Sequence, residues 1–332
     1  MKALVTGAGG FLGQYIVEQL RQRGDQVRAL VRRESPALAG LGVEIARGDI
    51  RNAAEVERAC EGVDVVFHTA AIASIWGPWK LFYETNTLGT RHVIEGCRKH
   101  RVPKLVFTSS PSVTFGGEDQ CNIDESAPYP SRWLAHYPHT KALAEQEVLA
   151  ANSDELLTCA LRPHLIWGPR DQHLIPRLLT RARSGQLRQV GDGQNLVDTI
   201  YVENAAHAHL QAADALSPGS PVAGRAYFLS QGEPVNCWGW INRILGLAGI
   251  SPVNRRISLR VAYAAGAVLE TLWKVTGRTS EPRMTRFLAL QLARHHYFDI
   301  SRARNDFGYE PRIGTEEGLR RLAASWTEGV KS

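Results

Sequence analysis

The chain has 332 residues, of which 44% are hydrophobic and 22% are charged, and its formal net charge at pH 7 is +6. This composition is that of an ordinary globular protein, and it excludes a disordered chain, a collagen-like fibre and a disulfide-stapled miniprotein. The five cysteines are odd in number and form no CxxC pair, so we expect reduced thiols in a cytoplasmic protein.

The first half of the chain alternates strand and helix patterns. Short apolar runs predict strands, and apolar residues at helical spacing predict the helices between them. The predicted strands are 2–6, 27–31, 43–46, 64–68, 104–108 and 157–162, and the predicted helices are 11–23, 53–60, 81–99 and 138–151. This alternation predicts an α/β fold with a doubly wound parallel (Rossmann) sheet, whose ligands bind at the carboxyl ends of the strands.

After about residue 168 the rhythm weakens into short apolar segments and Pro/Gly turns. We therefore predict a Rossmann domain over 1–168, to which a strand and a helix near 196–215 return. A smaller mixed C-terminal domain over 169–332 is expected to bind the substrate. Two helical stretches stand out there, 258–275 and 284–292, and the first is amphipathic enough to line an apolar pocket or to contact a membrane surface.

Three glycines follow the first predicted strand and open the first predicted helix. Gly7 would permit a tight turn, Gly10 would let the backbone approach a pyrophosphate, and Gly13 would allow close packing of helix on strand. Free N–H groups and the helix dipole would then hold the anion, with Phe11 and Leu12 in the same turn. The loop therefore predicts a dinucleotide site.

The end of the second predicted strand indicates which dinucleotide. NAD-binding folds place an acid there, whereas Val31 is followed by Arg32 and Arg33, and no carboxylate occurs until Glu34. Guanidinium groups can bind a 2′-phosphate bidentately. We predict a preference for NADP(H), with NAD(H) as the alternative if both arginines are solvated loop charges.

Tyr137 and Lys141 form a YxxxK motif at the start of a predicted helix. The spacing of four residues places both side chains on one face of that helix. A tyrosine with a pKa near 10 is a poor base at neutral pH, and a nearby ammonium would lower that pKa. We therefore expect Tyr137 to transfer the proton and Lys141 to tune it.

The glycine loop and the YxxxK motif together resemble the extended short-chain dehydrogenase/reductase (epimerase/dehydratase) superfamily, and the resemblance covers nearly the whole chain. The segments 108–113, 124–130, 137–145 and 297–311 are similar to its 3β-hydroxysteroid dehydrogenase branch, which includes bacterial 2-alkyl-3-ketoalkanoate reductases. The resemblance implies that Ser110, with Ser112 as the alternative, polarises the substrate oxygen, and that Lys141 also bonds the nicotinamide ribose.

The resemblance also implies further cofactor contacts. Asp49 and Ile50 would face the adenine, and the small residues Thr69, Ala70 and Ala71 would let the cofactor lie close. Asn86 matches the superfamily's helix asparagine. Pro163 and Ile166 would line the nicotinamide, whereas His164 replaces a residue that is usually smaller.

The implied activity is hydride transfer at a 3-keto or 3-hydroxy group of a bulky lipophilic substrate, such as a 2-alkyl-3-keto acid or a 3β-hydroxysteroid. The alternatives are a nucleotide-sugar epimerase or dehydratase with tightly bound NAD(P), and a non-catalytic cofactor-sensing regulator. No metal site is expected, because the adjacent His295 and His296 do not converge as ligands. No nucleic-acid partner is expected, because no basic run exceeds two residues. A homodimer is expected by analogy with the superfamily.

Overall fold

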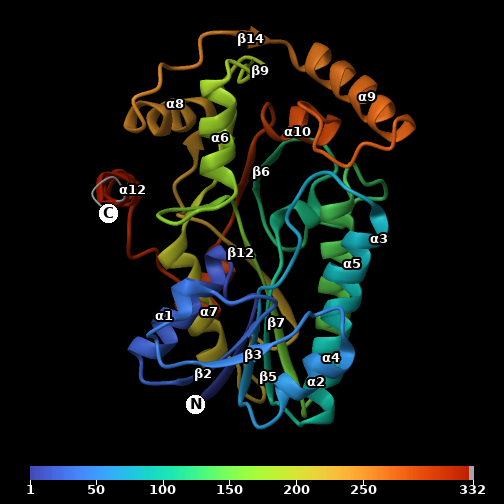
Figure 1. The fold of residues 1–332 in the computed structure, drawn as a ribbon, viewed down its shortest axis with the longest axis vertical. Helices are drawn as coiled ribbons and strands as arrows, with labels where there is room; N and C mark the ends of the chain where they lie inside the picture. Colours follow the sequence, from blue (N-terminus) through green and yellow to red (C-terminus); the bar gives the residue numbers. More distant parts are fainter. Residues whose placement is uncertain (329–332) are drawn as a thin grey trace.

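The structure is a computed structural model that describes residues 1–328 (Figure 1). Its central sheet has seven parallel strands in the order β12-β7-β5-β4-β1-β2-β3. The strands are β1 (Lys2–Thr6), β2 (Gln26–Val31), β3 (Glu44–Arg47), β4 (Val65–His68), β5 (Lys104–Thr108), β7 (Leu157–Pro163) and β12 (Arg225–Leu229). The predicted doubly wound sheet is thereby confirmed, and its switch point lies between β1 and β4, where such sheets bind ligands.

Helices cover both faces of this sheet, which explains why its inner strands read as continuous apolar runs. The helices α1 (Phe11–Gln22) and α7 (Val202–Ala215) pack together over one face. The helices α2 (Ala53–Cys60), α4 (Gly89–Lys99) and α5 (His136–Ala150) cover the other face. The helix α7 therefore packs on the central sheet, although it follows residue 168 in the chain.

Three local features differ from the sequence pattern. The predicted helix 81–99 is broken into α3 (Trp79–Phe82), a π-helical turn (Tyr83–Leu88) and α4. The helix α5 begins two residues earlier than predicted. The strand β12 lies in a segment to which the sequence pattern assigned no element. Its five residues form a strand at the sheet edge by pairing with the distant β7, and the local pattern does not predict that pairing.

Most of the remaining elements lie above the central sheet in Figure 1, whereas α11 (Ser301–Phe307) packs against β12 and α7. A four-stranded sheet has the order β13-β10-β15-β6, and two further strand pairs are β8 with β11 and β9 with β14. The strands are β6 (Gln120–Ile123), β8 (Ile166–Trp167), β9 (Gln189–Val190), β10 (Leu196–Val197), β11 (Ile200–Tyr201), β13 (Val235–Asn236), β14 (Arg256–Ile257) and β15 (His296–Phe298). The helices are α6 (Leu174–Arg183), α8 (Cys237–Leu247), α9 (Leu259–Val275), α10 (Arg286–Gln291), α11 (Ser301–Phe307) and α12 (Thr315–Glu328).

A small apolar cluster joins this upper part to the loop that follows β5. Phe115 packs edge-on against Phe287 of α10, and Leu290 completes the cluster. Leu134 and Ala135, just before α5, pack against the same cluster. The upper helices are thus anchored beside the start of the helix that carries the YxxxK motif.

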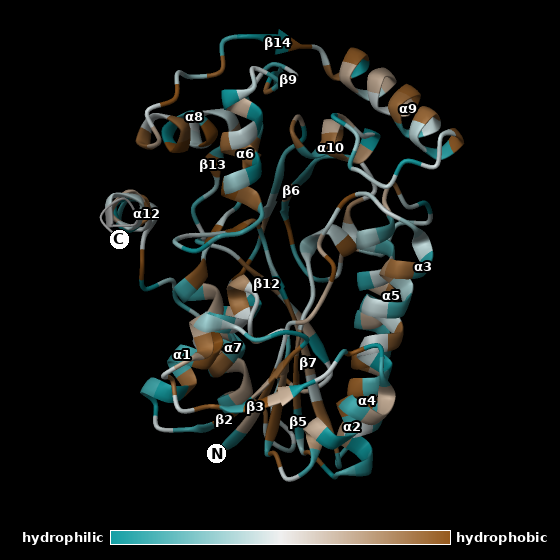
Figure 2. Cartoon of the chain, in the orientation of Figure 1, coloured by the Kyte–Doolittle hydropathy of each residue, from teal (hydrophilic) through white to brown (hydrophobic). Residues whose placement is uncertain are grey.

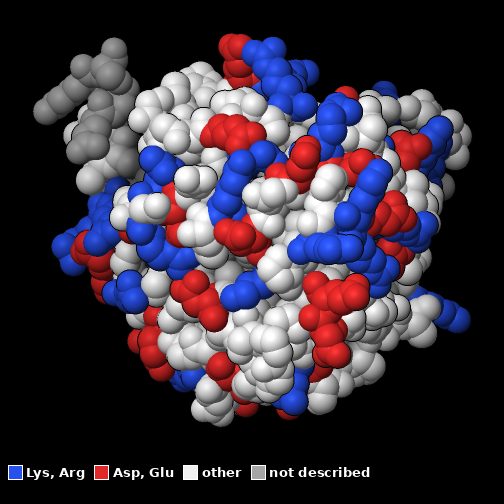
Figure 3. All heavy atoms as spheres, turned by 90° about the horizontal axis from the view of Figure 1, so that it is seen from below, with Lys and Arg blue, Asp and Glu red and all other residues white. Residues whose placement is uncertain are grey.

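Charges of both signs are interspersed on the face that Figure 3 shows, which is the lower end of the molecule in Figure 1. Many of the arginines on the protein are held in ion pairs, such as Arg28 with Glu44 and Arg23 with Asp214. The excess of positive charge therefore makes no single-sign surface on that face. Among the described residues, no helix combines the length and the hydropathy needed to cross a bilayer.

Candidate active site

The glycine loop has the geometry of an anion-binding turn. Gly7 has a φ of +68°, and a Cβ there would lie 2.8 Å from the Cα of Ala70. A Cβ on Gly13 would lie 2.3 Å from the carbonyl oxygen of Gly7, so neither position can hold a side chain. Gly10 is exposed, and it caps α1 without any side-chain acceptor for the N–H groups of the first turn. Those free donors, at Phe11 and Leu12, fit the pyrophosphate of a dinucleotide.

The segment after β4 lies against this loop. The Thr69 hydroxyl donates to the carbonyl oxygen of Thr6 at 2.7 Å, and the N–H of Ala70 donates to the Thr6 hydroxyl at 3.3 Å. Ala71, the next residue, is exposed. The small side chains therefore lie at the switch point of the sheet, where a bulkier one would fill the space beside Gly7.

The end of β2 presents two cations without local partners. Arg32 and Arg33 are exposed, and neither forms an ion pair within residues 1–328. The nearest acid in sequence, Glu34, is paired with Arg47 instead. This part of the loop approaches the glycine turn, because a Cβ on Gly9 would lie 3.3 Å from the Cβ of Ser35. The arrangement leaves two guanidiniums available to an anion near the loop.

Asp49 and Ile50 follow β3 but have different environments. Asp49 accepts hydrogen bonds from the backbone and the guanidinium of Arg51, which together hold the pKa of its carboxyl below the usual value. Ile50 is buried, and a Cβ on Gly89 would lie 2.9 Å from its Cδ1. Asp49 is thus accessible to a ligand, whereas Ile50 contributes mainly to packing between the loop and α4.

The YxxxK residues occupy successive turns of α5. Tyr137 is half-buried at the second position, and Lys141 is buried one turn later. The Lys141 ammonium donates to the carbonyl oxygen of Thr108 at 2.5 Å and lies 3.9 Å from the centroid of the Phe107 ring. Burial lowers the pKa of Lys141 to about 7, against a partial opposing effect of Glu145.

The pKa of Tyr137 is raised in the structure, whereas the sequence predicted that it would be lowered. Burial raises the pKa of Tyr137, and a hydrogen bond with Ser110 offsets only part of this rise. The ammonium of Lys141 is instead hydrogen-bonded to the carbonyl oxygen of Thr108 at the end of β5. Ser110 is therefore the polar group that the structure places on Tyr137.

The two candidate serines are hydrogen-bonded to each other. The hydroxyls of Ser110 and Ser112 are 2.9 Å apart, and the Ser110 hydroxyl also accepts from the N–H of Ser112 at 3.2 Å. Ser110 caps the 3-10 turn Pro111–Thr114 that follows β5. This cap fixes the Ser110 hydroxyl beside the phenol and leaves Ser112 one hydrogen bond away.

Asn86 connects the cofactor-side loop to α5. Its side chain accepts from the N–H of Ile72 at 2.8 Å and donates to the carbonyl oxygen of Ile72 at 3.1 Å. The same amide donates to the Thr140 hydroxyl, inside the YxxxK motif. The π-helical turn makes this possible by directing Asn86 inward, where it is buried. The role of Asn86 in the structure is therefore to hold two site segments together.

A buried histidine that sequence reasoning missed completes this network. His68 lies between the hydroxyls of Thr6, at 2.7 Å from Nδ1, and Thr90, at 2.9 Å from Nε2. The Thr90 hydroxyl donates to the carbonyl oxygen of Asn86, so Nε2 of His68 must carry the proton that it shares with Thr90. Burial, followed by the charge of Lys141, lowers the pKa of His68 to about 3, so the ring is neutral. Its only sequence signal was a polar residue at the end of an apolar strand.

The segment after β7 is held by a second histidine contact. Pro163 ends β7 and Ile166 opens β8, and both lie near the carboxyl edge of the sheet. Nε2 of His164 lies 2.6 Å from Nδ1 of His296, whose own Nε2 donates to the carbonyl oxygen of Gln291. His164 is therefore the donor to His296. Among the described residues, no cluster of three or more potential metal ligands occurs.

His139, inside the YxxxK motif, has an aromatic environment. Its ring stacks on Trp133 at 4.9 Å between centroids and lies 4.8 Å from Trp79. Trp79 also stacks on Tyr83 of the π-helical turn. His139 thus points away from Lys141 and contributes to a half-buried aromatic cluster beside the start of α5.

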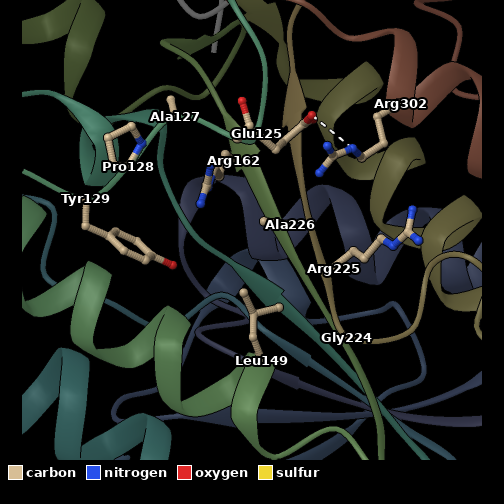
Figure 4. Close-up of a pocket in the computed structure, with 11 residues that line it drawn as sticks. Glu125, Ala127, Pro128, Tyr129, Leu149, Arg162, Gly224, Arg225, Ala226 and Arg302 are labelled. Atoms are coloured by element: carbon tan, nitrogen blue, oxygen red, sulfur yellow. Dashed lines mark ion pairs between the residues drawn. The ribbon is translucent and has the colours of Figure 1, made fainter.

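A cavity of about 600 Å³ lies elsewhere, at the outer edge of β12 (Figure 4). It includes none of the candidate catalytic residues. Glu125 and Arg302 point toward one another across it, 3.3 Å apart, and the Glu125 carboxylate also accepts from the N–H of Phe228. Arg162 lines the cavity and is paired with buried Glu145. These contacts attach α11 and the loop before α5 to the sheet edge.

The chain is similar to known proteins over most of its length. Residues 4–260 match the model of the 3-beta hydroxysteroid dehydrogenase/isomerase family. The chain is 49% identical to the "2-alkyl-3-oxoalkanoate reductase" of Stenotrophomonas maltophilia over 98% of this chain and 99% of that protein. It is 48% identical to the protein of the same name from Shewanella oneidensis, over 97% and 86% of the two chains.

More distant matches also cover most of the chain. The mouse "Sterol-4-alpha-carboxylate 3-dehydrogenase, decarboxylating" is 36% identical over 98% of this chain and 91% of its own. Among solved structures, "MoeE5 in complex with UDP-glucose and NAD" superposes with a TM-score of 0.77 at 26% identity, covering 99% of this chain and all of the other.

Proposed function

Because the chain belongs to the 3-beta hydroxysteroid dehydrogenase/isomerase family, we propose that it transfers hydride between a nicotinamide cofactor and a 3-keto or 3-hydroxy group of a bulky lipophilic substrate. The observation that carries this proposal is the arrangement of Ser110, Tyr137 and Lys141 at the carboxyl ends of β5 and the start of α5. A cofactor bound at the glycine loop would supply the hydride.

The side chains have distinct roles in this reaction. In the reductive direction, the Tyr137 hydroxyl donates a proton to the substrate oxygen as the carbonyl carbon is reduced. The raised pKa of Tyr137 keeps the phenol protonated for this step. Ser110 donates a hydrogen bond to the same oxygen, and Ser112 orients the Ser110 hydroxyl. Lys141 is held at the end of β5 by the carbonyl oxygen of Thr108, and its ammonium would bond the nicotinamide ribose of a bound cofactor.

NADP(H) is the cofactor we propose, and the charges at the end of β2 support it. Arg32 and Arg33 are exposed and without ion-pair partners within residues 1–328, whereas Glu34 is neutralised by Arg47. A ribose 2′-hydroxyl would find no free carboxylate at this strand end. A 2′-phosphate would instead meet two guanidiniums, whose fork geometry matches it.

The substrate class we propose is a β-oxo or β-hydroxy acid. A 2-alkyl-3-oxoalkanoate has its carboxylate on the carbon next to the oxo-bearing carbon. A sterol 4α-carboxylate that is dehydrogenated at position 3 has the same relationship between the two groups. The shared feature of these relatives' named substrates is thus a carboxylate whose β-carbon bears the reacting oxygen, on an otherwise lipophilic molecule.

A substrate panel tests the proposal. The purified chain would be given a 2-alkyl-3-oxo acid, a 3-oxo steroid and UDP-glucose, each with NADPH or NADH, and loss of the reduced nicotinamide's absorbance would be followed. We expect turnover of the oxo acid with NADPH and none of the nucleotide sugar. Conversion of UDP-glucose without added cofactor would support the second candidate, a nucleotide-sugar epimerase, which the NAD and UDP-glucose complex of a 26%-identical neighbour brings into the test.

We also propose a cytoplasmic location and a homodimer. The absence of any disulfide among the five cysteines supports the location, because thiols stay reduced in the cytosol. The helices α4 and α5 lie side by side on one face of the sheet and offer a two-helix surface for a symmetric partner. Sedimentation or light scattering of the full chain would measure its oligomeric state.

A further inference from the structure

The helix α9 exposes an unusual amount of apolar surface. Of the eight large apolar side chains that are exposed within residues 1–328, four lie on this one helix: Val261, Val268, Leu272 and Val275. Their exposed fractions reach 67% at Val268 and 81% at Val275. The spacings of seven, four and three residues place all four in one stripe along the helix. Figure 2 shows hydrophobic segments, coloured brown, along α9 at the upper end of the molecule.

The opposite face of α9 is already used for packing. Ala262, Gly266 and Glu270 are its buried residues, and they follow each other at intervals of four. A Cβ on Gly266 would lie 2.6 Å from the backbone of Thr285, so α9 and the start of α10 are in close contact. Glu270 accepts hydrogen bonds from the backbone and the side chain of Arg286. The exposed stripe is therefore on a different face of α9 from the one that packs against the start of α10.

Positive charge surrounds this stripe. Residues 250–285 contain six basic and two acidic residues. Both acids are occupied, because Glu270 pairs with Arg286 and Glu281 pairs with Arg177 and Arg181. All six basic residues are exposed, and within residues 1–328 none of them forms an ion pair. They are Arg255, Arg256, Arg260, Lys274, Arg278 and Arg283.

We propose that α9 is a docking surface for an anionic lipid bilayer. The apolar stripe would enter the boundary between headgroups and acyl chains, and the six cations at its two ends would meet the lipid phosphates. A second copy of the chain fits this surface poorly. A two-fold interface would bring the same six unpaired cations of both copies together. In an anionic bilayer, the lipid phosphates themselves would balance these cations.

This surface adjoins the catalytic helix. The indole N–H of Trp76, in the loop before α3, donates to the carbonyl oxygen of Arg278 just beyond α9. Lys274 lies close enough to His136, the residue before Tyr137, that its charge adds to burial in lowering the pKa of His136. A bilayer against α9 would therefore lie beside the start of α5. This proposal goes beyond the proposed reaction and does not depend on it.

Co-sedimentation of the full chain with vesicles tests the proposal. One vesicle set would contain phosphatidylcholine alone, and the other would contain phosphatidylcholine with phosphatidylglycerol. We expect at least about tenfold stronger binding to the anionic vesicles, with a loss of binding at high salt. The double variant Val268→Asp/Leu272→Asp is expected to lose this binding. The triple variant Arg255→Glu/Arg256→Glu/Arg260→Glu is expected to weaken it while leaving the apolar stripe intact.

Leu247→Asp supplies the matched control, because Leu247 is 41% exposed at the end of α8 and outside the proposed surface. It should bind the anionic vesicles as the wild type does. Circular dichroism and thermal unfolding would establish that each variant is folded. The proposal is overturned if the folded wild type does not bind anionic vesicles, or if Leu247→Asp weakens binding as much as Val268→Asp/Leu272→Asp does. It is also overturned if the wild type is a dimer that Val268→Asp/Leu272→Asp dissociates.

Discussion

The ammonium nitrogen of Lys141 lies 3.9 Å from the centroid of the Phe107 ring, deep at the carboxyl end of β5. Thr108, the next residue, accepts a hydrogen bond from the same ammonium. The strand that leads to Ser110 therefore also provides the two contacts that stabilise the buried cation. A cation over an aromatic face is worth about 0.5–2 kcal/mol, more when both partners are desolvated.

Removing the ring at position 107 should change the titration of Lys141. In Phe107→Leu the ammonium loses its π contact, so the pKa of Lys141 should fall further, by up to about one unit. Because the reaction needs the charged lysine, the alkaline limb of the kcat profile should move to lower pH. Phe107→Tyr keeps the ring and should keep the limb in place. An unmoved limb in a folded leucine variant would show that the ring does not support the cation.

The buried lysine should also destabilise the fold at neutral pH. The pKa of Lys141 is about 7 in the folded chain, against about 10.4 in an unfolded one. Between these values the unfolded chain binds the extra proton, so the free energy of unfolding should rise with pH by up to roughly 1.4 kcal/mol per unit. Lys141→Met should lack this contribution and be more stable than the wild type near pH 7. Urea unfolding at several pH values measures both slopes, and parallel slopes would refute this assignment.

The two arginines after β2 should determine cofactor preference. In Arg32→Ala/Arg33→Ala, kcat/KM for NADPH should fall at least about tenfold, because charge-assisted hydrogen bonds contribute roughly 1.5–3 kcal/mol. The value for NADH should stay within about twofold. Arg98→Ala, an exposed arginine near the end of α4, is the control and should change neither. Equal losses with both cofactors would argue against a 2′-phosphate contact.

Two glycines of the loop should respond differently to alanine. In Gly13→Ala the new methyl group would lie 2.3 Å from the carbonyl oxygen of Gly7, which forces the helix away from the strand. We expect a loss of about 1–3 kcal/mol or more in stability. In Gly10→Ala the nearest atom would be 3.1 Å away, so the fold should persist while cofactor affinity falls. Thermal unfolding and cofactor titration separate the two effects, and a Gly10→Ala variant with normal affinity would contradict the pyrophosphate site.

The local sequence pattern was sufficient to predict the elements whose apolar and turn residues recur regularly. Six of the seven strands up to residue 163 follow from apolar runs, as the glycine loop follows from its turn residues, and the structure has them within a few residues; only β6 (Gln120–Ile123) was not predicted there. The strand β12 was not predictable in this way, because a five-residue run becomes a sheet edge only through β7. The π-helical turn Tyr83–Leu88 was also missed, because it is defined by its i→i+5 backbone hydrogen bonds and not by a pattern of apolar residues.

The polar network of the site depends on contacts between distant parts of the chain. His68 meets Thr6 across 62 residues, and His164 meets His296 across 132 residues. Neither pair has a spacing that a single sequence could reveal. The expected effect of Lys141 on Tyr137 also depended on where the ammonium points, and the structure directs it to Thr108 instead.

The central claim is that Tyr137 gives the proton that accompanies hydride transfer to a 3-oxo acid. The most direct measurement is single-turnover oxidation of NADPH by a 2-alkyl-3-oxo acid, with the wild type compared with Tyr137→Phe at matched cofactor occupancy. The phenylalanine variant should bind NADPH with unchanged affinity, and its rate of chemistry should be lower by about 10²–10⁴-fold. A rate within a few-fold of the wild type, at equal NADPH occupancy, would contradict the role of Tyr137.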